Sequence, residues 1–120
     1  MLCGWALVRN VMTTDIITLQ QDSEIIKAMR ALLDHTVSGA PVLNNAGDMV
    51  GILSQRDCLR ALLNAHYLQV WGGQVKQYMV QPVVTMDPDL DLASADSIFI
   101  ESRYRRFPVI QDGNLLGQIS

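Results

Sequence analysis

Short apolar runs alternate with stretches of helical periodicity in the first half of the chain. After Asp22 or Ser23, each a suitable N-cap, apolar residues recur on one face of a predicted helix, at Ile25, Met29 and Leu32. Runs of strand length, bounded by turn residues, lie on either side of this helix. The predicted elements are a strand at 15–19, a helix whose apolar face runs from Ile25 to Leu33, strands at 41–43 and 49–53 joined by a turn at 44–48, and a helix from Ser54 to about residue 65.

The same order of elements occurs a second time. Met79 follows Met12 by 67 residues, and Gly117 follows Gly51 by 66, because the second hairpin turn is one residue shorter. A unit of this size cannot bury its own apolar face, so two units should pack together about a pseudo-twofold axis. We therefore expect an α/β fold of the α+β kind, with a first β-α-β-β-α repeat at 6–65, a linker at 66–74 and a second repeat at 75–120.

Composition narrows the classes of partner. The chain has 120 residues, 49% of them hydrophobic and 18% charged, with a net charge of −3, which argues against a nucleic-acid partner. Arginines cluster at positions 103, 105 and 106, an arrangement that suits a small anionic ligand. Two cysteines make no disulfide framework, no signal peptide is recognisable, and no apolar run could span a bilayer. A cytoplasmic location is expected.

Residues 51–57, GILSQRD, read as a strand that runs directly into a helix. Ser54 is a favoured N-cap residue, and Asp57 falls at the third helical position on the same rim. A carboxylate there can accept hydrogen bonds from a vicinal diol such as the 2′- and 3′-hydroxyls of a ribose. The same Ser-x-x-Asp spacing is also an ordinary capping box. Both interpretations stay open at this point.

Other candidate chemistry is weak. Residues 87–91, DPDLD, imitate the start of a calcium loop, but Leu92 stands where that loop needs glycine and Ile98 where it needs glutamate. The sequence has no metal-ligand cluster, no nucleophile–base pair and no Walker-type loop. We therefore expect no enzyme, no metal and no required cofactor.

The repeat resembles the tandem CBS domain, or Bateman module, over about residues 6–120. Its motifs are Val11-Met12 and Tyr78-Met79 at the start of each copy and GILSQRD at the end of the first. In the middle stand SGAPV at 38–42 and RRFPV at 105–109. Each motif is weak alone, whereas their order and spacing, twice over, are specific.

The resemblance implies two clefts between the paired sheets, each of which can hold an adenosine-bearing ligand. In the first cleft, Asp57 would hold the ribose and the backbone of Val83 and Val84 the adenine edge. Arg105 and Arg106 would meet phosphates, to which guanidinium groups are well matched. The residues implied for the first cleft are Ser54, Asp57, Val83, Val84, Tyr104, Arg105, Arg106 and Pro108, with Tyr104 and Pro108 as walls for the ring.

The second cleft departs from the family pattern. It lacks an Arg or His at Ser38 and Gly39, and the sequence ends at Ser120, the counterpart of Ser54, so no second Asp follows. We expect a C-terminally truncated second repeat and a poorer site, empty or suited to an uncharged adenosine moiety. The residues implied for it are Ile16, Ile17, Val37, Ser38, Gly39, Ala40, Pro41 and Ser120.

The resemblance implies a regulatory module that senses AMP, ADP, ATP or S-adenosylmethionine. Its helices would form a homodimer, and it would act on an effector protein that the sequence does not identify. The alternative is a homodimerisation or interaction scaffold that binds no ligand.

Overall fold

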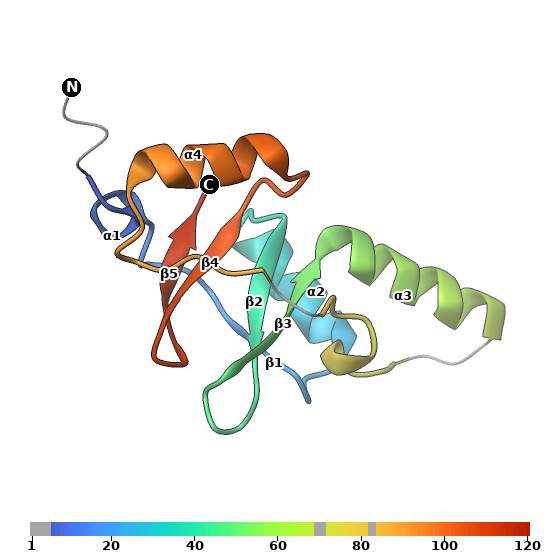
Figure 1. Ribbon diagram of the computed structural model, residues 1–120. Helices are drawn as coiled ribbons and strands as arrows, with labels where there is room; N and C mark the ends of the chain where they lie inside the picture. Colours follow the sequence, from blue (N-terminus) through green and yellow to red (C-terminus); the bar gives the residue numbers. More distant parts are fainter. Residues whose placement is uncertain (1–5, 69–71, 82–83) are drawn as a thin grey trace. The chain divides into compact units, whose positions relative to one another are not determined.

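The computed structural model describes residues 6–68, 72–81 and 84–120, which belong to two compact units (Figure 1). Residues Ile17–Val83 make one unit, here called the central unit. Residues Met1–Ile16 and Val84–Ser120 make the other, here called the split unit because its two parts are distant in sequence.

The central unit is a three-stranded sheet covered by helices (Figure 1). The strand order is β1-β2-β3, with β1 parallel and β3 antiparallel to β2. Its elements are β1 (Leu19–Gln20), α2 (Ile25–Asp34), β2 (Gly39–Leu43), β3 (Met49–Ser54), α3 (Gln55–Leu68) and the 3₁₀ helix η1 (Val75–Gln77). The buried core joins the sheet to α2, α3 and η1 through Leu19, Ile25, Ala28, Leu32, Ala40, Val42, Leu53, Cys58, Ala61 and Val75.

The split unit has a two-stranded antiparallel hairpin and two helices (Figure 1). Its elements are α1 (Val8–Val11), α4 (Leu92–Glu101), β4 (Phe107–Gln111) and β5 (Asn114–Ile119). Phe107 is almost fully buried, and the ring of Phe99 on α4 meets it edge to face at 4.9 Å between centroids. The buried core is Val8, Met86, Ala95, Phe107, Val109 and Ile119.

The two units repeat one another in detail. Helix α4 begins and ends 67 residues after α2, at Leu92–Glu101 against Ile25–Asp34. Each hairpin has its register shift at the matched place, between Val42 and Leu43 and between Val109 and Ile110. The predicted mixed α+β fold built from two such repeats is confirmed.

The compact units differ from the sequence repeats in one respect, which is where each lead segment packs. Val8, at the start of the first repeat, is fully buried in the split unit with the elements of the second repeat. Its counterpart Val75 is fully buried in the central unit with the elements of the first. The lead segments are therefore exchanged between the repeats.

Matched ion pairs accompany this exchange. Arg9 lies 2.7 Å from Asp89 in the split unit, and Lys76 lies 3.0 Å from Asp22 in the central unit. Both pairs are partly exposed, so each contributes at most about 1 kcal/mol to stability. Their value here is that they confirm the equivalence of the two lead segments.

Three local predictions need correction. The predicted strand at 15–19 is present only as Leu19–Gln20, and the helix that follows has Glu24, not Asp22 or Ser23, at its N-cap. The reason is that the chain before this helix pairs with the lead segment of the second repeat. The Asp22 carboxylate is paired with Lys76, the Ser23 carbonyl accepts a hydrogen bond from Val75, and Glu24 forms a β-bridge with Gln74, so the chain stays extended up to Glu24. Helix α3 continues to Leu68, into residues predicted as linker.

Candidate functional site

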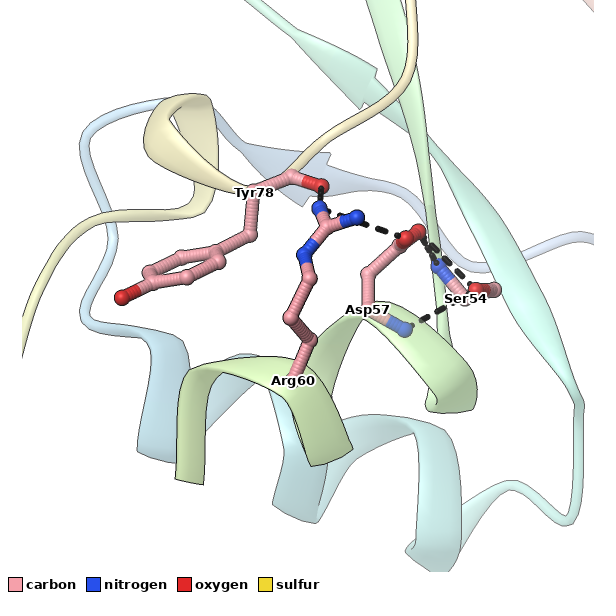
Figure 2. A network of polar contacts seen from close by, with 4 residues as sticks. All are labelled: Ser54, Asp57, Arg60 and Tyr78. Atoms are coloured by element: carbon pink, nitrogen blue, oxygen red, sulfur yellow. Dashed lines mark hydrogen bonds and ion pairs between the residues drawn. The ribbon is translucent and has the colours of Figure 1, made fainter. Parts of the chain in front are cut away.

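The turn from β3 into α3 is built as a capping box (Figure 2). The Ser54 hydroxyl accepts a hydrogen bond from the backbone N–H of Asp57 at 3.2 Å. In return, the Asp57 carboxylate accepts from the backbone N–H of Ser54 at 2.8 Å. Two donors that the helix leaves unpaired are thereby satisfied. The capping interpretation of Ser-x-x-Asp is confirmed.

The Asp57 carboxylate has acceptor capacity beyond the cap. Oδ2 receives both the Ser54 N–H at 2.8 Å and the Ser54 hydroxyl at 2.9 Å. A carboxylate has about four lone-pair sites, so the capacity that remains lies on Oδ1. Asp57 is only 5% exposed, and a buried charge needs partners. Oδ1 is therefore the atom at which a ligand hydroxyl could donate without displacing Ser54.

Two residues that were not predicted as site residues, Arg60 and Tyr78, lie beside this capping box. The Arg60 Nη2 lies 3.6 Å from Asp57 Oδ1 and donates to the Tyr78 carbonyl at 2.9 Å (Figure 2). The guanidinium also lies over the Tyr78 ring, 5.9 Å from its centroid. The sequence could have indicated Arg60, because it stands three residues after Asp57, and opposite charges at this spacing are neighbours on one face of a helix.

Cys58 follows Asp57 but faces the core. Burial raises the pKa of the Cys58 thiol, and the neighbouring Asp57 carboxylate raises this pKa further. The thiol therefore stays protonated at neutral pH, which suits a core residue rather than a nucleophile.

The remaining residues predicted for the first cleft lie in the split unit, apart from Val83, which is outside the described residues. Val84 and Tyr104 are about half exposed, and the Tyr104 ring lies edge to face against Phe107 at 6.0 Å. Arg105 and Arg106 are exposed, whereas Pro108 is buried in β4. Their assignment to one ligand with Asp57 stays a prediction.

The residues predicted for the second cleft also belong partly to the central unit and partly to the split unit. The segment from Val37 to Pro41 leads into β2, where Gly39 pairs with Ser54, so residues predicted for different clefts are cross-strand neighbours. Gln55 holds this segment: its side chain donates to the Val37 carbonyl at 3.0 Å and its N–H to the Ser38 carbonyl at 2.8 Å. Ala40 in this segment is buried. Of the remaining residues, the half-buried Ile17 lies in the central unit, whereas Ile16 and the exposed Ser120 lie in the split unit.

Ser120 borders a groove of about 260 Å³ on the split unit. The groove is lined by Val11, Leu92, Ala95, Asp96, Phe99, Ile119 and Ser120. In the central unit, the matched wall of α2 is covered by α3, which buries Cys58 and Ala61 against it. The groove is thus the repeat counterpart of the surface on which α3 packs.

The described residues contain neither a group of metal-ligating side chains nor a helix able to cross a membrane. Within residues 6–68, 72–81 and 84–120, no group of His, Cys, Asp and Glu side chains could hold a metal ion. In the same described ranges, no helix combines the length and apolar character that crossing a bilayer requires. In the acidic segment 87–91, Asp87 accepts from the Asp89 N–H at 2.7 Å and Asp91 caps α4, so both carboxylates serve local turns.

Two copies of a small α+β unit with exchanged lead segments, one carrying a Ser-Asp capping box at its strand-to-helix turn, define a tandem-repeat module. The CBS domain model matches residues 8–64 and 75–120, and the chain belongs to the CBS domain family. Over 94% of its length it is 29% identical to uncharacterized protein MJ1225 of Methanocaldococcus jannaschii. It spans 39% of the length of that relative.

Solved CBS-pair structures share the fold. The structure of CBSX2 in complex with AMP matches with a TM-score of 0.82 at 24% identity, covering 95% of this chain and 89% of that one. The CBS pair of MJ0100, solved with 5′-methylthioadenosine and S-adenosyl-L-methionine, matches with a TM-score of 0.78 at 22% identity, covering 96% and 89%. The predicted family is confirmed.

Proposed function

We propose that this chain is a regulatory module that binds an adenosine nucleotide, with the ribose hydroxyls held by Asp57. The observation that carries the proposal is the state of the Asp57 carboxylate. Oδ2 is used twice by Ser54, whereas Oδ1 keeps acceptor capacity beside the first turn of α3. The backbone N–H groups of such a turn also favour negative charge nearby.

The ligand class comes from family members. CBSX2 was solved with AMP, and the MJ0100 pair with 5′-methylthioadenosine and S-adenosyl-L-methionine. These ligands share an adenine and a ribose and differ in charge at the 5′ position. AMP, ADP, ATP and S-adenosylmethionine are therefore the compounds to test, with Arg105 and Arg106 as the proposed phosphate contacts.

Substitution of Asp57 tests the proposal. A hydrogen bond to a charged group contributes about 1.5–3 kcal/mol, and about 1.4 kcal/mol is a tenfold change in affinity. Asp57→Ala should therefore weaken AMP binding roughly ten- to a hundredfold in isothermal titration calorimetry.

The matched controls are Asp57→Asn and 2′,3′-dideoxyadenosine monophosphate. Asparagine keeps an acceptor oxygen for Ser54 but removes the charge, so it should weaken binding less than alanine does. The dideoxy compound lacks both ribose hydroxyls, so its affinity should be low and insensitive to Asp57→Ala. Equal loss of affinity for AMP and the dideoxy compound on Asp57→Ala would contradict the ribose assignment.

A second candidate function is a homodimerisation scaffold that binds no ligand. It is favoured by large apolar side chains on the surface of α2 and α3: Leu33 is 58%, Leu59 57% and Leu63 52% exposed. Calorimetry with the four adenosyl compounds separates the two functions. Absence of binding to all four, together with a dimeric mass in light scattering, would support the scaffold, which would act through a partner protein.

A further inference from the structure

The Arg60 side chain lies between two acceptors that belong to different parts of the central unit (Figure 2). One is Asp57 Oδ1, on the first turn of the same helix. The other is the carbonyl oxygen of Tyr78, which directly follows η1. The Arg60 side chain is 56% exposed and long, so it can change its position between the two without repacking the core.

The same guanidinium nitrogen, Nη2, faces both acceptors. It lies 2.9 Å from the Tyr78 oxygen, a hydrogen bond, and 3.6 Å from Asp57 Oδ1, an ion pair too long for a hydrogen bond. In this structure Arg60 is therefore bonded to the backbone of Tyr78 and only attracted by Asp57. Any change in the charge or hydrogen bonding of Asp57 Oδ1 therefore changes how strongly Arg60 is drawn away from the Tyr78 carbonyl.

The Tyr78 carbonyl belongs to a short segment that fastens to the central unit at both ends. At one end Val75 is fully buried in the core. At the other end Val80 pairs with Ile52 of β3: the Val80 N–H donates to the Ile52 carbonyl at 2.8 Å, and the Ile52 N–H donates back at 3.1 Å. Strengthening or weakening the hydrogen bond from Arg60 to the Tyr78 carbonyl should therefore change the stability of the Ile52–Val80 hydrogen bonds.

We infer that Arg60 is a positioning residue that couples the state of Asp57 Oδ1 to the 75–80 segment. Hydroxyl groups that donate to Oδ1 satisfy its negative charge, so Oδ1 attracts Arg60 less and the guanidinium stays on the Tyr78 carbonyl. Occupancy at Asp57 thus tightens the segment that opens the second sequence repeat. The ligand binds better when Arg60 is on the Tyr78 carbonyl than when Arg60 is on Asp57 Oδ1, so it favours the first of these two states. The shift can be no larger than this difference in binding free energy. This regulatory role rests on the function proposed above.

A test without ligand uses Asp57→Asn, which removes the competing charge while keeping an acceptor for Ser54. Hydrogen exchange of the Ile52 and Val80 amides, measured by NMR, should become about two- to fivefold slower relative to the Asn44 amide, which donates to the Asp48 carbonyl in the turn between β2 and β3. In an Arg60→Gln background, Asp57→Asn should leave this ratio unchanged. An equal change in both backgrounds would overturn the coupling.

The single variant Arg60→Gln keeps the inference testable if Asp57→Asn disturbs the cap. It should speed hydrogen exchange at the Ile52 and Val80 amides by about two- to fivefold relative to the Asn44 amide. Arg56→Gln, which removes an exposed arginine one turn earlier on α3, is the matched control and should leave the ratio unchanged. An equal effect of the two arginine variants would also overturn the inference.

Addition of AMP separates this inference from the proposed function. In the unsubstituted chain, hydrogen exchange at Ile52 and Val80 should be slower with saturating AMP than without it. In Arg60→Gln, AMP should bind with a Kd changed by less than about threefold but should no longer slow these amides. If AMP fails to bind the unsubstituted chain, the proposed function is contradicted for AMP, while the ligand-free cycle still decides whether Arg60 couples Asp57 to the segment.

Discussion

The Ser54 hydroxyl has two roles at the residue scale. It accepts the Asp57 N–H at 3.2 Å and donates to Asp57 Oδ2 at 2.9 Å, so it caps the helix and holds the carboxylate with one atom. Because Asp57 is nearly buried, the orientation of its second oxygen depends on this contact. A site for a ribose can thus be built on a cap that the fold needs in any case.

Removing the Ser54 hydroxyl should lower the stability of the fold. Ser54→Ala removes the N-cap acceptor and leaves Oδ2 with the backbone N–H of Ser54 alone. We expect the free energy of unfolding, from urea titration, to fall by about 1 kcal/mol. Ser54→Thr keeps the hydroxyl and should stay close to the unsubstituted chain. Equal stability of the alanine and threonine variants would show that the hydroxyl does not support the cap.

The capping contacts between Ser54 and Asp57 could be predicted from the sequence, because they span three residues and follow from helix geometry. The sequence was not sufficient for Arg60, whose bond to the Tyr78 carbonyl spans 18 residues. That bond depends on where the chain returns after α3 and on one side-chain conformation. Neither quantity is encoded in local spacing.

The equivalent helices α2 and α4 begin differently at the element scale. Asp91 caps α4 and accepts from the Ser94 N–H at 3.0 Å and the Ser94 hydroxyl at 2.7 Å. Glu24, the counterpart of Asp91, makes no side-chain cap. Hydrogen bonds from the Ser94 side chain, followed by those from its backbone, lower the pKa of Asp91 below its ordinary value of 3.8.

This pKa shift predicts how the cap responds to acid. Because the pKa is lower in the folded state, the cap's stabilisation is fully present above pH 3.8 and is lost as the pH falls through the folded value. Asp91→Asn keeps an acceptor that does not titrate. The urea midpoint of the unsubstituted chain should therefore fall towards that of Asp91→Asn, or below it, as the pH is lowered below 3.8. A gap between the two proteins that stays constant with pH would contradict this assignment.

Two matched glycines let each lead segment cross a strand. A Cβ on Gly117 would overlap the backbone carbonyl oxygen of Thr13, which pairs with Gln118 in β5. A Cβ on Gly51 would lie 2.7 Å from the sulfur of Met79, a flexible side chain, and 3.1 Å from the Val80 carbonyl. Both glycines therefore give space for backbone, as close strand approach requires.

Alanine substitution should distinguish these two crossings. Gly117→Ala should destabilise by about 1–3 kcal/mol in urea unfolding, because the obstructing atom is backbone. Gly51→Ala should cost less, because the Met79 side chain can change its conformation. The reverse order would show that Met79 is held more rigidly than the Thr13 backbone.

The internal repeat made most of the fold predictable at the scale of the whole molecule. Periodicity placed α2, the two hairpins and the start of α3, and the constant offset of 67 and then 66 residues identified the second copy. The exchange of lead segments was not predictable from periodicity. Val8 and Val75 each lie beside their own repeat in the sequence, and only tertiary packing assigns each to the core of the other.

The exchanged packing of the two lead segments predicts which unit a cavity in a lead segment will destabilise. Val8→Ala should lower the free energy of unfolding by roughly 1.5–3 kcal/mol, because Val8 is fully buried. Hydrogen exchange should quicken first at two amides of the split unit: that of Met86, which donates to the Pro108 carbonyl, and that of Ile110, which donates to the Met86 carbonyl. Val75→Ala should act instead on the Ile52 and Val80 amides of the central unit.

These paired variants are each other's control, since residue type, burial and position in the repeat are the same. Contacts assign Val8 to the core that contains Phe107 and Val109, so loss of its methyl groups removes partners from β4. If Val8→Ala instead quickened exchange at Ile52 and Val80 as much as at Met86 and Ile110, the two units would open as one. The split unit would then have no separate stability, and a signal at Asp57 could not stay confined to the central unit.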